Sequence, residues 1–341
     1  MMIELKKRLN IIKKSKKIKV FYFGNTVKKE SNNFYITEIK ENKKFIYFGA
    51  VIFNNYHAKK IAKIIDGNVD FALIDVEKKV VSKNKSIYIN IERSVKDVLK
   101  NTKIFTYKGN DLTVQACETL INYIYLNDVR GIGGKNILVL GSGNIGFKIS
   151  QKLVESGGNV YMYRRNQKIL EKTVFTINAL TPKATVAKAR KIKSLSLNLN
   201  KYDLIIGTTN GEPLINKEHI KKLKTKLVII DVGKGILKKE ALDLAINQNI
   251  SLFRLDITPA YDGYLENVYS TEKLNNINLI KSKIVKNLEL VKRGILSKEG
   301  SIIVDNVIFP KKIYGISDGK GSFKKTNNKK IFEIKKKLLI K

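Results

Sequence analysis

The sequence predicts an α/β protein in which a doubly wound parallel sheet is preceded by a smaller α/β domain. Short strands that are apolar throughout alternate with helical segments in the second half, which is typical of a parallel sheet covered on both faces. A glycine-rich turn joins one of these strands to a helix. Runs rich in β-branched and aromatic residues also alternate with helical segments in the first half, which indicates a separate α/β domain there.

The composition is that of a folded chain. Its 341 residues are enough for two domains, and 43% hydrophobic with 28% charged residues excludes a disordered protein. No stretch approaches the roughly 20 consecutive apolar residues of a membrane span, and no secretory signal is recognisable at the start. We therefore expect a cytoplasmic protein without a transmembrane segment. The single cysteine, Cys117, excludes an internal disulfide and a cysteine-based zinc cluster, and we expect no metal site.

The net charge of +36 raises the question of a nucleic-acid partner. Of the 66 basic residues, 58 are Lys and 8 are Arg, the residue preferred for bidentate contacts with phosphates and bases. A solvated, lysine-rich surface is therefore the favoured interpretation, and nucleic acid is a less favoured partner. Residues 6–19 and the tail from residue 320 are denser in lysine, which leaves RNA or an anionic membrane surface open as alternatives there.

The smaller domain is expected over residues 1–112. A helix is predicted near its middle, because Ile61, Ile64 and Ile65 follow helical spacing and Gly67 stands where a C-cap is expected. The strand-like runs of this domain lie at 19–24, 34–39, 44–53, 69–76 and 86–91.

The doubly wound sheet is expected over residues 113–269. A helix at 111–128, with Asp111 or Thr113 as its N-cap, leads into this domain. Residues 270–341 are expected to form a helix over 270–296 and a basic tail that pack back on the first domain. The strands of the sheet are predicted at 135–140, 159–163, 203–210, 227–233 and 250–256, and its helices at 144–156, 216–224 and 238–249.

The glycine-rich turn is the most informative motif. It follows a strand, opens a helix and is followed by a second strand, which is typical of a Rossmann-type dinucleotide-binding unit. The first glycine would make the tight turn, the second would let the backbone approach a pyrophosphate, and the third would let helix and strand pack closely. A glycine-rich turn without a ligand is the alternative. The residues of the motif are Gly141, Ser142, Gly143, Asn144, Ile145 and Gly146.

The end of the second strand indicates which dinucleotide is bound. An acidic residue there would accept a hydrogen bond from the ribose 2′-OH of NAD, but the strand continues with Arg164 and Arg165, and the next acid is Glu171. Two guanidinium groups suit a 2′-phosphate, so NADP is favoured over NAD. An arginine that is simply exposed to solvent is the alternative. The loops after the fourth and fifth strands are expected beside the nicotinamide, with Thr208, Thr209 and Gly233.

Three stretches within residues 111–265 resemble a group of enzymes that have a catalytic α/β domain first and an NADP-binding domain second. The group includes shikimate dehydrogenase, methylenetetrahydrofolate dehydrogenase and glutamyl-tRNA reductase. The resemblance implies an NADP-dependent oxidoreductase whose substrate lies between two domains. The stretches are GKNILVLGSGNIG with YRRN, KYDLIIGTTNGEPLI, and LVIIDVGKG with LDITPAYDGYL.

Two pairs of residues are candidates for catalysis. Tyr56 and Lys60 form a Y-x-x-x-K pattern on the predicted helix, and the resemblance to the folate enzymes implies a catalytic Tyr and Lys at this spacing. Lys108 and Asp111, at the start of the interdomain helix, are an independent pair. A solvated Lys60 and a simple N-cap at Asp111 are the alternatives.

Together these features predict an NADP-dependent oxidoreductase. It would act on a C=O/CH–OH or C=N/CH–N pair of a small polar metabolite, and we expect it to be a homodimer. A one-carbon enzyme like methylenetetrahydrofolate dehydrogenase is one alternative. A non-catalytic dinucleotide sensor or RNA-binding protein that kept the fold is the other.

Overall fold

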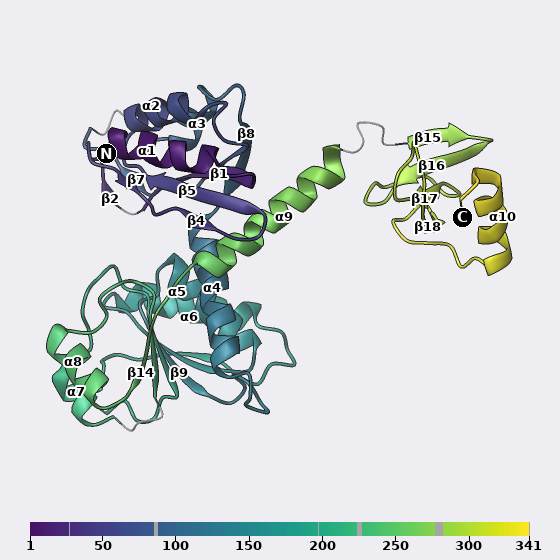
Figure 1. The fold of residues 1–341 in the computed structure, drawn as a ribbon. Coiled ribbons are helices and arrows are strands. Elements are labelled where there is room, and N and C mark those ends of the chain that lie inside the picture. The colour runs from purple at the N-terminus through teal and green to yellow at the C-terminus, as the bar shows by residue number, and fades with distance from the viewer. Residues whose placement is uncertain (27, 85–87, 197, 224–226, 277–281, 341) are drawn as a thin grey trace. The chain divides into compact units, whose positions relative to one another are not determined.

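The computed structural model describes the chain except for residues 27, 85–87, 197, 224–226, 277–281 and 341. The chain divides into two compact units, Met1–Gly263 and Tyr264–Lys341 (Figure 1). The first unit contains two separate sheets, each with its own hydrophobic core. Among the described residues, no helix combines the length and the apolar character that crossing a membrane requires.

The first sheet carries the N-terminal part of the first unit. Its strand order is β3-β5-β1-β6-β8, with β4 also paired with β5, and only β3 and β4 are antiparallel to their neighbour. Strands β2 (Lys28–Lys29) and β7 (Val80–Val81) form a short parallel ladder of their own. The strands of the sheet are β1 (Ile18–Gly24), β3 (Tyr35–Ile36), β4 (Lys40–Glu41), β5 (Phe45–Val51), β6 (Phe71–Asp75) and β8 (Lys103–Tyr107).

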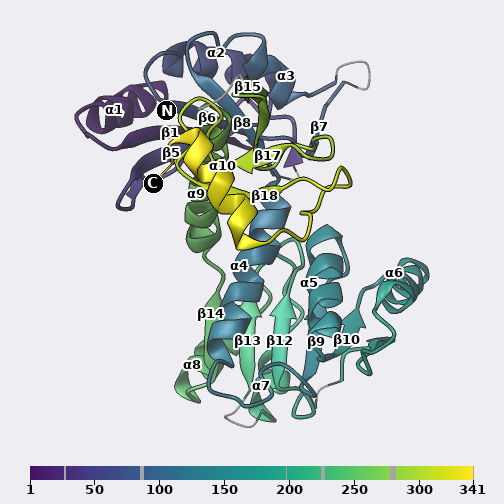
Figure 2. The ribbon, with the colours of Figure 1, turned by 90° about the vertical axis from the view of Figure 1, so that its right-hand side faces the viewer.

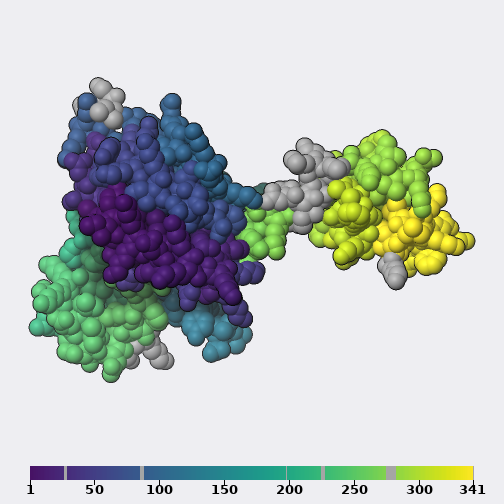
Figure 3. All heavy atoms as spheres, turned by 45° about the horizontal axis from the view of Figure 1, so that its top comes forward, coloured from purple at the N-terminus to yellow at the C-terminus, as the bar shows by residue number. Residues whose placement is uncertain are grey.

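Three helices cover this sheet: α1 (Met2–Lys13), α2 (Asn55–Ile65) and α3 (Ile91–Lys96). Much of the basic stretch at 6–19 belongs to α1, which buries Leu5, Leu9 and Ile12 in the core and leaves its lysines at the surface. In the space-filling view this N-terminal segment, in purple, lies on the surface of the first unit (Figure 3). The lysine-rich start of the chain is therefore the outer face of an amphipathic helix.

One expectation for this domain is wrong in the part that the structure describes. No strand is found in the described part of the run at 86–91, because the Asn90 side chain accepts a hydrogen bond from Arg93 N and starts α3. The rest of that run lies outside the described residues. The strand β8 replaces it at the edge of the sheet, where Phe105 pairs with Leu73 of β6.

The second sheet is entirely parallel. Its order, β11-β10-β9-β12-β13-β14, is the 3-2-1-4-5-6 order of a doubly wound dinucleotide-binding fold, and Figure 2 shows its strands behind α4 and α5. Its strands are β9 (Asn136–Leu140), β10 (Asn159–Tyr163), β11 (Ala189–Lys191), β12 (Leu204–Gly207), β13 (Val228–Asp231) and β14 (Ser251–Arg254). Its helices are α4 (Gly109–Ile124), α5 (Asn144–Glu155), α6 (Gln167–Leu180), α7 (Lys217–Lys221) and α8 (Lys239–Asn247).

Alternate residues of the central strand β9 enter two different cores. Ile137 and Val139 pack with residues of α4, α5 and α6, whereas Leu138 and Leu140 pack with residues of α7 and α8. Both faces of the sheet are therefore buried, which explains why its strands are apolar throughout. The predicted α/β class with a doubly wound sheet is confirmed.

The helix α4 begins two residues earlier than predicted. Its N-cap is Lys108, which makes no side-chain capping hydrogen bond, so the prediction of Asp111 or Thr113 as N-cap is wrong. Thr113 Oγ1 instead donates to the Gly109 carbonyl (2.9 Å). Cys117 is fully buried on this helix, and burial raises the pKa of its thiol to about 12, so it is part of the core.

The second unit is a small sheet with a helix packed on it. The helix α9 (Thr258–Asn276) begins in the first unit and leads into it. The strands, in spatial order, are β15 (Ser282–Val285), β16 (Leu288–Lys292), β17 (Ile302–Val304) and β18 (Ile313–Ile316), and α10 (Asn328–Leu338) adds Ile334 to their core. The prediction of a helix over 270–296 is wrong from Ser282 onward, where β15 begins, and its part at 277–281 lies outside the described residues. Lys286 and Asn287 both have positive φ and form the tight turn between β15 and β16.

Candidate active site

The glycine-rich turn has the backbone geometry that the motif predicts. Gly141 follows β9 with φ +104°, and a Cβ at this position would meet Thr208 Oγ1 at 2.8 Å. Thr208 Oγ1 donates a hydrogen bond to the Gly141 carbonyl (2.8 Å), which fixes the turn. A Cβ on Gly146 would overlap the same carbonyl oxygen. Both positions therefore require glycine, one for the turn and one for the close approach of α5.

The space above this turn suits an anionic group. Gly143 is the N-cap of α5, and a Cβ there would meet nothing within 4 Å. No side chain caps this end of the helix, so its first amides and its partial positive charge face open space. Ser142 Oγ is buried here without a hydrogen-bond partner among the described residues. These features fit the pyrophosphate of a dinucleotide, which would accept hydrogen bonds from the amides and from the serine hydroxyl.

The two arginines lie at the end of β10, on the side where such a fold binds the adenosine. Arg164 Nη1 donates to the Ser142 carbonyl (3.0 Å), which holds its guanidinium beside the glycine-rich turn. Arg165 forms an ion pair with Glu212 (2.8 Å), and both side chains are at least half exposed. Glu171 pairs with Lys191 instead of facing this site. The surroundings of the arginines are therefore positive and reachable by a ligand.

A cleft of about 710 Å³ lies within the first unit. Residues that follow β1, β6 and β8 line one wall, and the loops after β12, β13 and β14 line the other. Carboxyl ends of parallel strands are where α/β folds usually bind ligands. The polar residues of the first wall include Asn25, Lys79 and Asn110, and those of the second include Asn210, Lys234, Arg254 and Asp256.

Lys79 is a charged group of the cleft that is held by two carboxylates. Its Nζ lies 3.0 Å from Asp75 Oδ2 and 2.7 Å from Glu77 Oε2, and only 10% of its side chain is exposed. Burial raises the pKa of Asp75, and the charge of Lys79 opposes this rise. A lysine held between two carboxylates at the wall of a cleft can donate a hydrogen bond, and then a proton, to a substrate.

The start of α4 completes this cluster. Gly109 N donates to Asp75 Oδ1 (3.4 Å), and Asn110 N donates to Glu77 Oε2 (2.8 Å). A Cβ on Gly109 would lie 2.9 Å from Asp75 Oδ2 and 3.1 Å from Lys79 Nζ. The close approach of helix and ion cluster therefore depends on a glycine at this position.

The start of α9 closes one side of the cleft through aromatic contacts. The ring of Tyr261 lies 5.0 Å from that of Tyr22, 5.5 Å from that of Tyr47 and 5.7 Å from that of Tyr107, measured between centroids. Next to it, Asp262 Oδ1 accepts hydrogen bonds from Tyr47 Oη (2.9 Å) and Asn42 Nδ2 (3.0 Å). These contacts fasten the last segment of the first unit to its first sheet.

The structure does not bring the predicted catalytic residues into the cleft. Tyr56 and Lys60 lie one turn apart on α2, Tyr56 is 65% exposed, and neither lines the cleft. Lys108 is an exposed N-cap, and Asp111 forms an ion pair with Lys148 of α5 on the outer side of α4. The sequence analysis missed Lys79 and its two carboxylates. Their signal was a run of charged residues directly after an apolar strand.

The residues predicted in the loops after β12 and β13 have different structural roles. Gly233 lines the cleft, and a Cβ there would overlap the Thr209 carbonyl, so the loops after β12 and β13 touch at this glycine. Thr208 supports the glycine-rich turn, and Thr209 Oγ1 donates to the Glu212 carbonyl (3.1 Å). The threonines therefore shape the backbone of the site, and Gly233 belongs to its wall.

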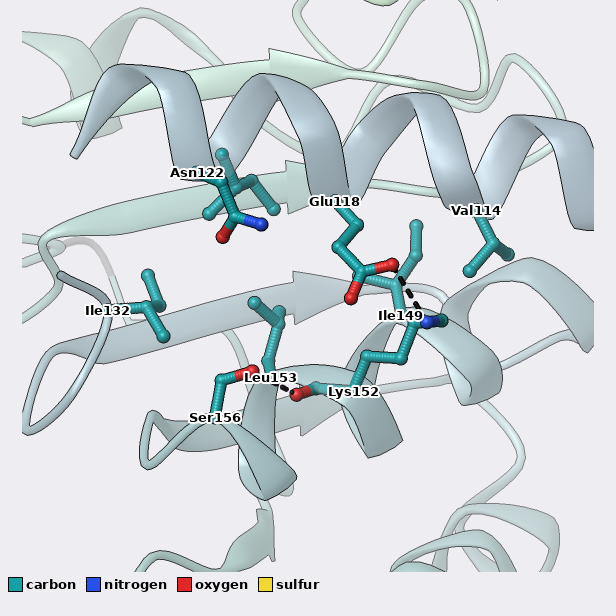
Figure 4. A pocket seen from close by; sticks show the side chains of 9 residues that line it. Val114, Glu118, Asn122, Ile132, Ile149, Lys152, Leu153 and Ser156 are labelled. Carbon is teal, nitrogen blue, oxygen red and sulfur yellow. Dashed lines mark hydrogen bonds and ion pairs between the residues drawn. The ribbon is translucent and has the colours of Figure 1, made fainter. Parts of the chain in front are cut away.

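A second pocket, between α4 and α5, is too small for an organic ligand. Figure 4 shows its lining residues, with the ion pair between Lys152 and Glu118 (2.7 Å) across it. Its volume is about 10 Å³, roughly the space of one water molecule. In the described part of the chain, no cluster of His, Cys, Asp and Glu has an arrangement that could hold a metal ion. The cleft, which brings Lys79 together with the loops after β12 and β13, is the candidate site.

Known proteins resemble parts of this chain. Residues 125–267 match the family model described as D-isomer specific 2-hydroxyacid dehydrogenase, NAD binding domain. Residues 125–267 form a dehydrogenase-type NAD-binding domain. The predicted resemblance to NAD(P)-dependent dehydrogenases is confirmed at the level of this domain.

A curated relative is the glutamyl-tRNA reductase of Flavobacterium psychrophilum, which is 26% identical over 212 residues. The match covers 59% of this chain and 48% of the relative, so the chain spans about half the length of that protein. Two solved structures are also similar to this chain. A dipicolinate synthase structure from Bacillus halodurans is 12% identical, with a TM-score of 0.38 over 74% of this chain and 97% of that chain. Shikimate dehydrogenase in complex with NADP+ is 13% identical, with a TM-score of 0.38 over 70% and 84%.

Proposed function

We propose that this protein is an NADP-dependent oxidoreductase that acts in the cleft on a C=O/CH–OH or C=N/CH–N pair of a small polar metabolite. The observation that carries the proposal is that Lys79, held by Asp75 and Glu77, lines the same cleft as the loops after β12 and β13. In a doubly wound fold these loops border the nicotinamide. A group that can give a proton thus shares a cavity with the position where a hydride is exchanged.

The preference for NADP is supported by the end of β10. Arg164 and Arg165 are the side chains that would bind the 2′-phosphate, and no acidic residue of the strand is placed to accept a hydrogen bond from a free 2′-OH. Gly143 and the amides at the start of α5 would hold the pyrophosphate.

The positions of these groups indicate which one would transfer the hydride and which one the proton. A bound nicotinamide dinucleotide supplies or accepts the hydride. In the direction of reduction, the substrate carbon gains the hydride and its oxygen or nitrogen gains a proton from Lys79, which then regains a proton from water. Asp75 and Glu77 hold the ammonium group in place before the transfer. In the direction of oxidation, Lys79 first gives a proton to water, and its neutral amine then accepts the proton from the substrate.

The test compares Lys79→Met and Lys79→Arg with the wild type. We expect NADPH fluorescence titrations to show binding by all three proteins, because Lys79 lies in the wall formed by the first sheet. Turnover on a panel of carbonyl and imine substrates should fall at least 100-fold in Lys79→Met. Lys79→Arg keeps the positive charge between the carboxylates, so this variant should keep the fold. A loss of turnover in Lys79→Arg would therefore reflect loss of the proton donor.

Lys60→Met is the matched control, because Lys60 is a lysine of the same domain that lies outside the cleft. It should leave turnover unchanged. Full activity of folded Lys79→Met, or its loss in Lys60→Met, would overturn the assignment of Lys79. Failure of the wild type to bind either nicotinamide dinucleotide would overturn the proposed function as a whole.

A further inference from the structure

The ion pair between Arg165 and Glu212 crosses the nucleotide-binding edge of the second sheet. Arg165 follows β10 and Glu212 lies in the loop after β12, and β9 with its glycine-rich turn lies between these two strands. A dinucleotide bound to this fold runs across the same edge. One of the two arginines expected to hold a 2′-phosphate is therefore already bound to a carboxylate of the protein.

The two arginines differ in what holds them. Arg164 donates to a neutral carbonyl, that of Ser142, so a phosphate can approach it without displacing a charge. Arg165 contacts Glu212 at 2.8 Å, and 74% of its side chain and 50% of that of Glu212 are exposed. An anion in solution can reach this pair directly. A phosphate that takes Arg165 has to replace the carboxylate.

The loop that carries Glu212 is held by its own hydrogen bonds. Thr209 Oγ1 donates to the Glu212 carbonyl (3.1 Å), and Gly211 N donates to the Thr209 carbonyl (2.9 Å). Gly211 has φ +76°, which favours glycine at this place in the turn. The hydrogen bonds of this turn therefore place Glu212 next to Arg165, and they do not depend on the ion pair.

We propose that Glu212 is a residue that sets cofactor discrimination, because its carboxylate competes with the 2′-phosphate of NADP for Arg165. The inference rests on the proposed function. NADP binding through Arg165 has to break the pair. NAD has no 2′-phosphate and leaves the pair intact. Glu212 therefore weakens the binding of NADP and leaves the binding of NAD unchanged.

The magnitude follows from the exposure of the pair. Exposed ion pairs contribute little, which corresponds to about a two- to fivefold change in a dissociation constant. We expect Glu212→Gln, which keeps the shape and removes the charge, to bind NADPH about two- to fivefold more tightly than the wild type at low salt. The gain should shrink as salt is added. The dissociation constant of NADH should not change.

Three further variants separate this competition from a general effect of charge. Arg165→Ala should bind NADPH more weakly than the wild type. Adding Glu212→Gln to Arg165→Ala should then change nothing, because the two residues act on the phosphate through their pair. Glu218→Gln is the matched control. Glu218 is an exposed glutamate of the same domain that pairs with Lys221 at 3.0 Å, and its substitution should alter neither dissociation constant.

Fluorescence titration with NADPH and NADH provides the decisive comparison. Tighter binding of NADPH alone in Glu212→Gln, lost in the Arg165→Ala background, supports the inference. An unchanged NADPH affinity, or equal tightening for both cofactors, would overturn it while leaving the proposed function intact. A wild type that binds neither dinucleotide would overturn both.

Discussion

The two walls of the cleft use different means to build a site. On the wall of the first sheet, charged side chains make the site: Lys79 is enclosed by Asp75 and Glu77, and the cluster is almost buried. On the wall of the second sheet, the backbone makes it, because a Cβ on Gly233 would overlap the Thr209 carbonyl. Gly141 and Gly146, in the glycine-rich turn of the same sheet, also lie where no Cβ fits. A backbone site can hold a large cofactor by shape, whereas a side-chain site can carry a proton. Substitutions in the first wall should therefore impair proton transfer, and substitutions in the second wall should impair cofactor binding.

The largest effect on stability is expected in the side-chain wall. Lys79→Met leaves the buried Asp75 carboxylate without its cation, which should lower the free energy of unfolding by about 3 kcal/mol near neutral pH. Burial already raises the pKa of Asp75. A carboxyl group with a raised pKa stabilises the fold when protonated and loses that contribution as pH rises, so the defect should shrink on acidification.

Urea unfolding of Lys79→Met at about pH 7 and about pH 4 checks this dependence. The double variant Lys79→Met/Asp75→Asn should recover part of the loss near pH 7, because Asp75, the more buried of the two carboxylates, is then replaced by a neutral group. A defect of equal size at both pH values would show that packing, and not charge, holds this wall together.

The next largest effect is expected in the backbone wall. Gly146→Ala places a Cβ against the Gly141 carbonyl and should lower the free energy of unfolding by about 2 kcal/mol, with loss of NADPH binding. Gly143→Ala is its control, since a Cβ there meets nothing and φ is −77°. This control should unfold like the wild type in thermal denaturation. Equal destabilisation by both substitutions would contradict the close approach described for α5.

A smaller effect is expected where α9 meets the first sheet. Tyr47→Phe removes one of the two hydrogen bonds to Asp262 and should lower the free energy of unfolding by about 1 kcal/mol. Tyr56→Phe, at an exposed position of α2, serves as the control and should have no effect. Urea unfolding of both variants measures the difference. If Tyr47→Phe were as stable as Tyr56→Phe, the contact of α9 with the first sheet would depend on ring packing alone.

The smallest effect is expected from His219, which does not line the cleft. Its ring is buried and its Nδ1 accepts from Asn216 N (3.2 Å) in a capping box, and burial lowers the pKa of the ring below its ordinary value of 6.5. A histidine with a lowered pKa stabilises the fold above its ordinary value, and this contribution is lost as pH falls. The slope of stability against pH between about 7 and 5 should be flatter in His219→Gln. An unchanged slope would assign the acid sensitivity to other groups.

The same contrast between the walls explains what could be predicted from the sequence. The turn at Gly141–Gly146 and its flanking strands are local, so spacing and residue type were enough to place them. Lys79 is one of 58 lysines, and its partners include the start of α4, some 30 residues later, which no local pattern reveals. The Y-x-x-x-K pattern of Tyr56 and Lys60 has the spacing of a catalytic pair, but it points to solvent. Between 282 and 292, the apolar residues fit both helical and alternating spacing, so the sequence pattern is ambiguous. The structure forms a hairpin there, with Asn287 at positive φ in its turn.

The position of Gly109 connects the two walls. It belongs to α4, whose body is anchored in the core beneath the nucleotide-binding sheet through Cys117 and Ile121, yet its first turn abuts the ion cluster of the other domain. Most of α4 therefore packs against the second sheet, whereas its first turn lies beside the ammonium group of Lys79. The same helix therefore takes part in both walls of the cleft: its body packs in the core of the second sheet, and Gly109 N donates to Asp75 of the first.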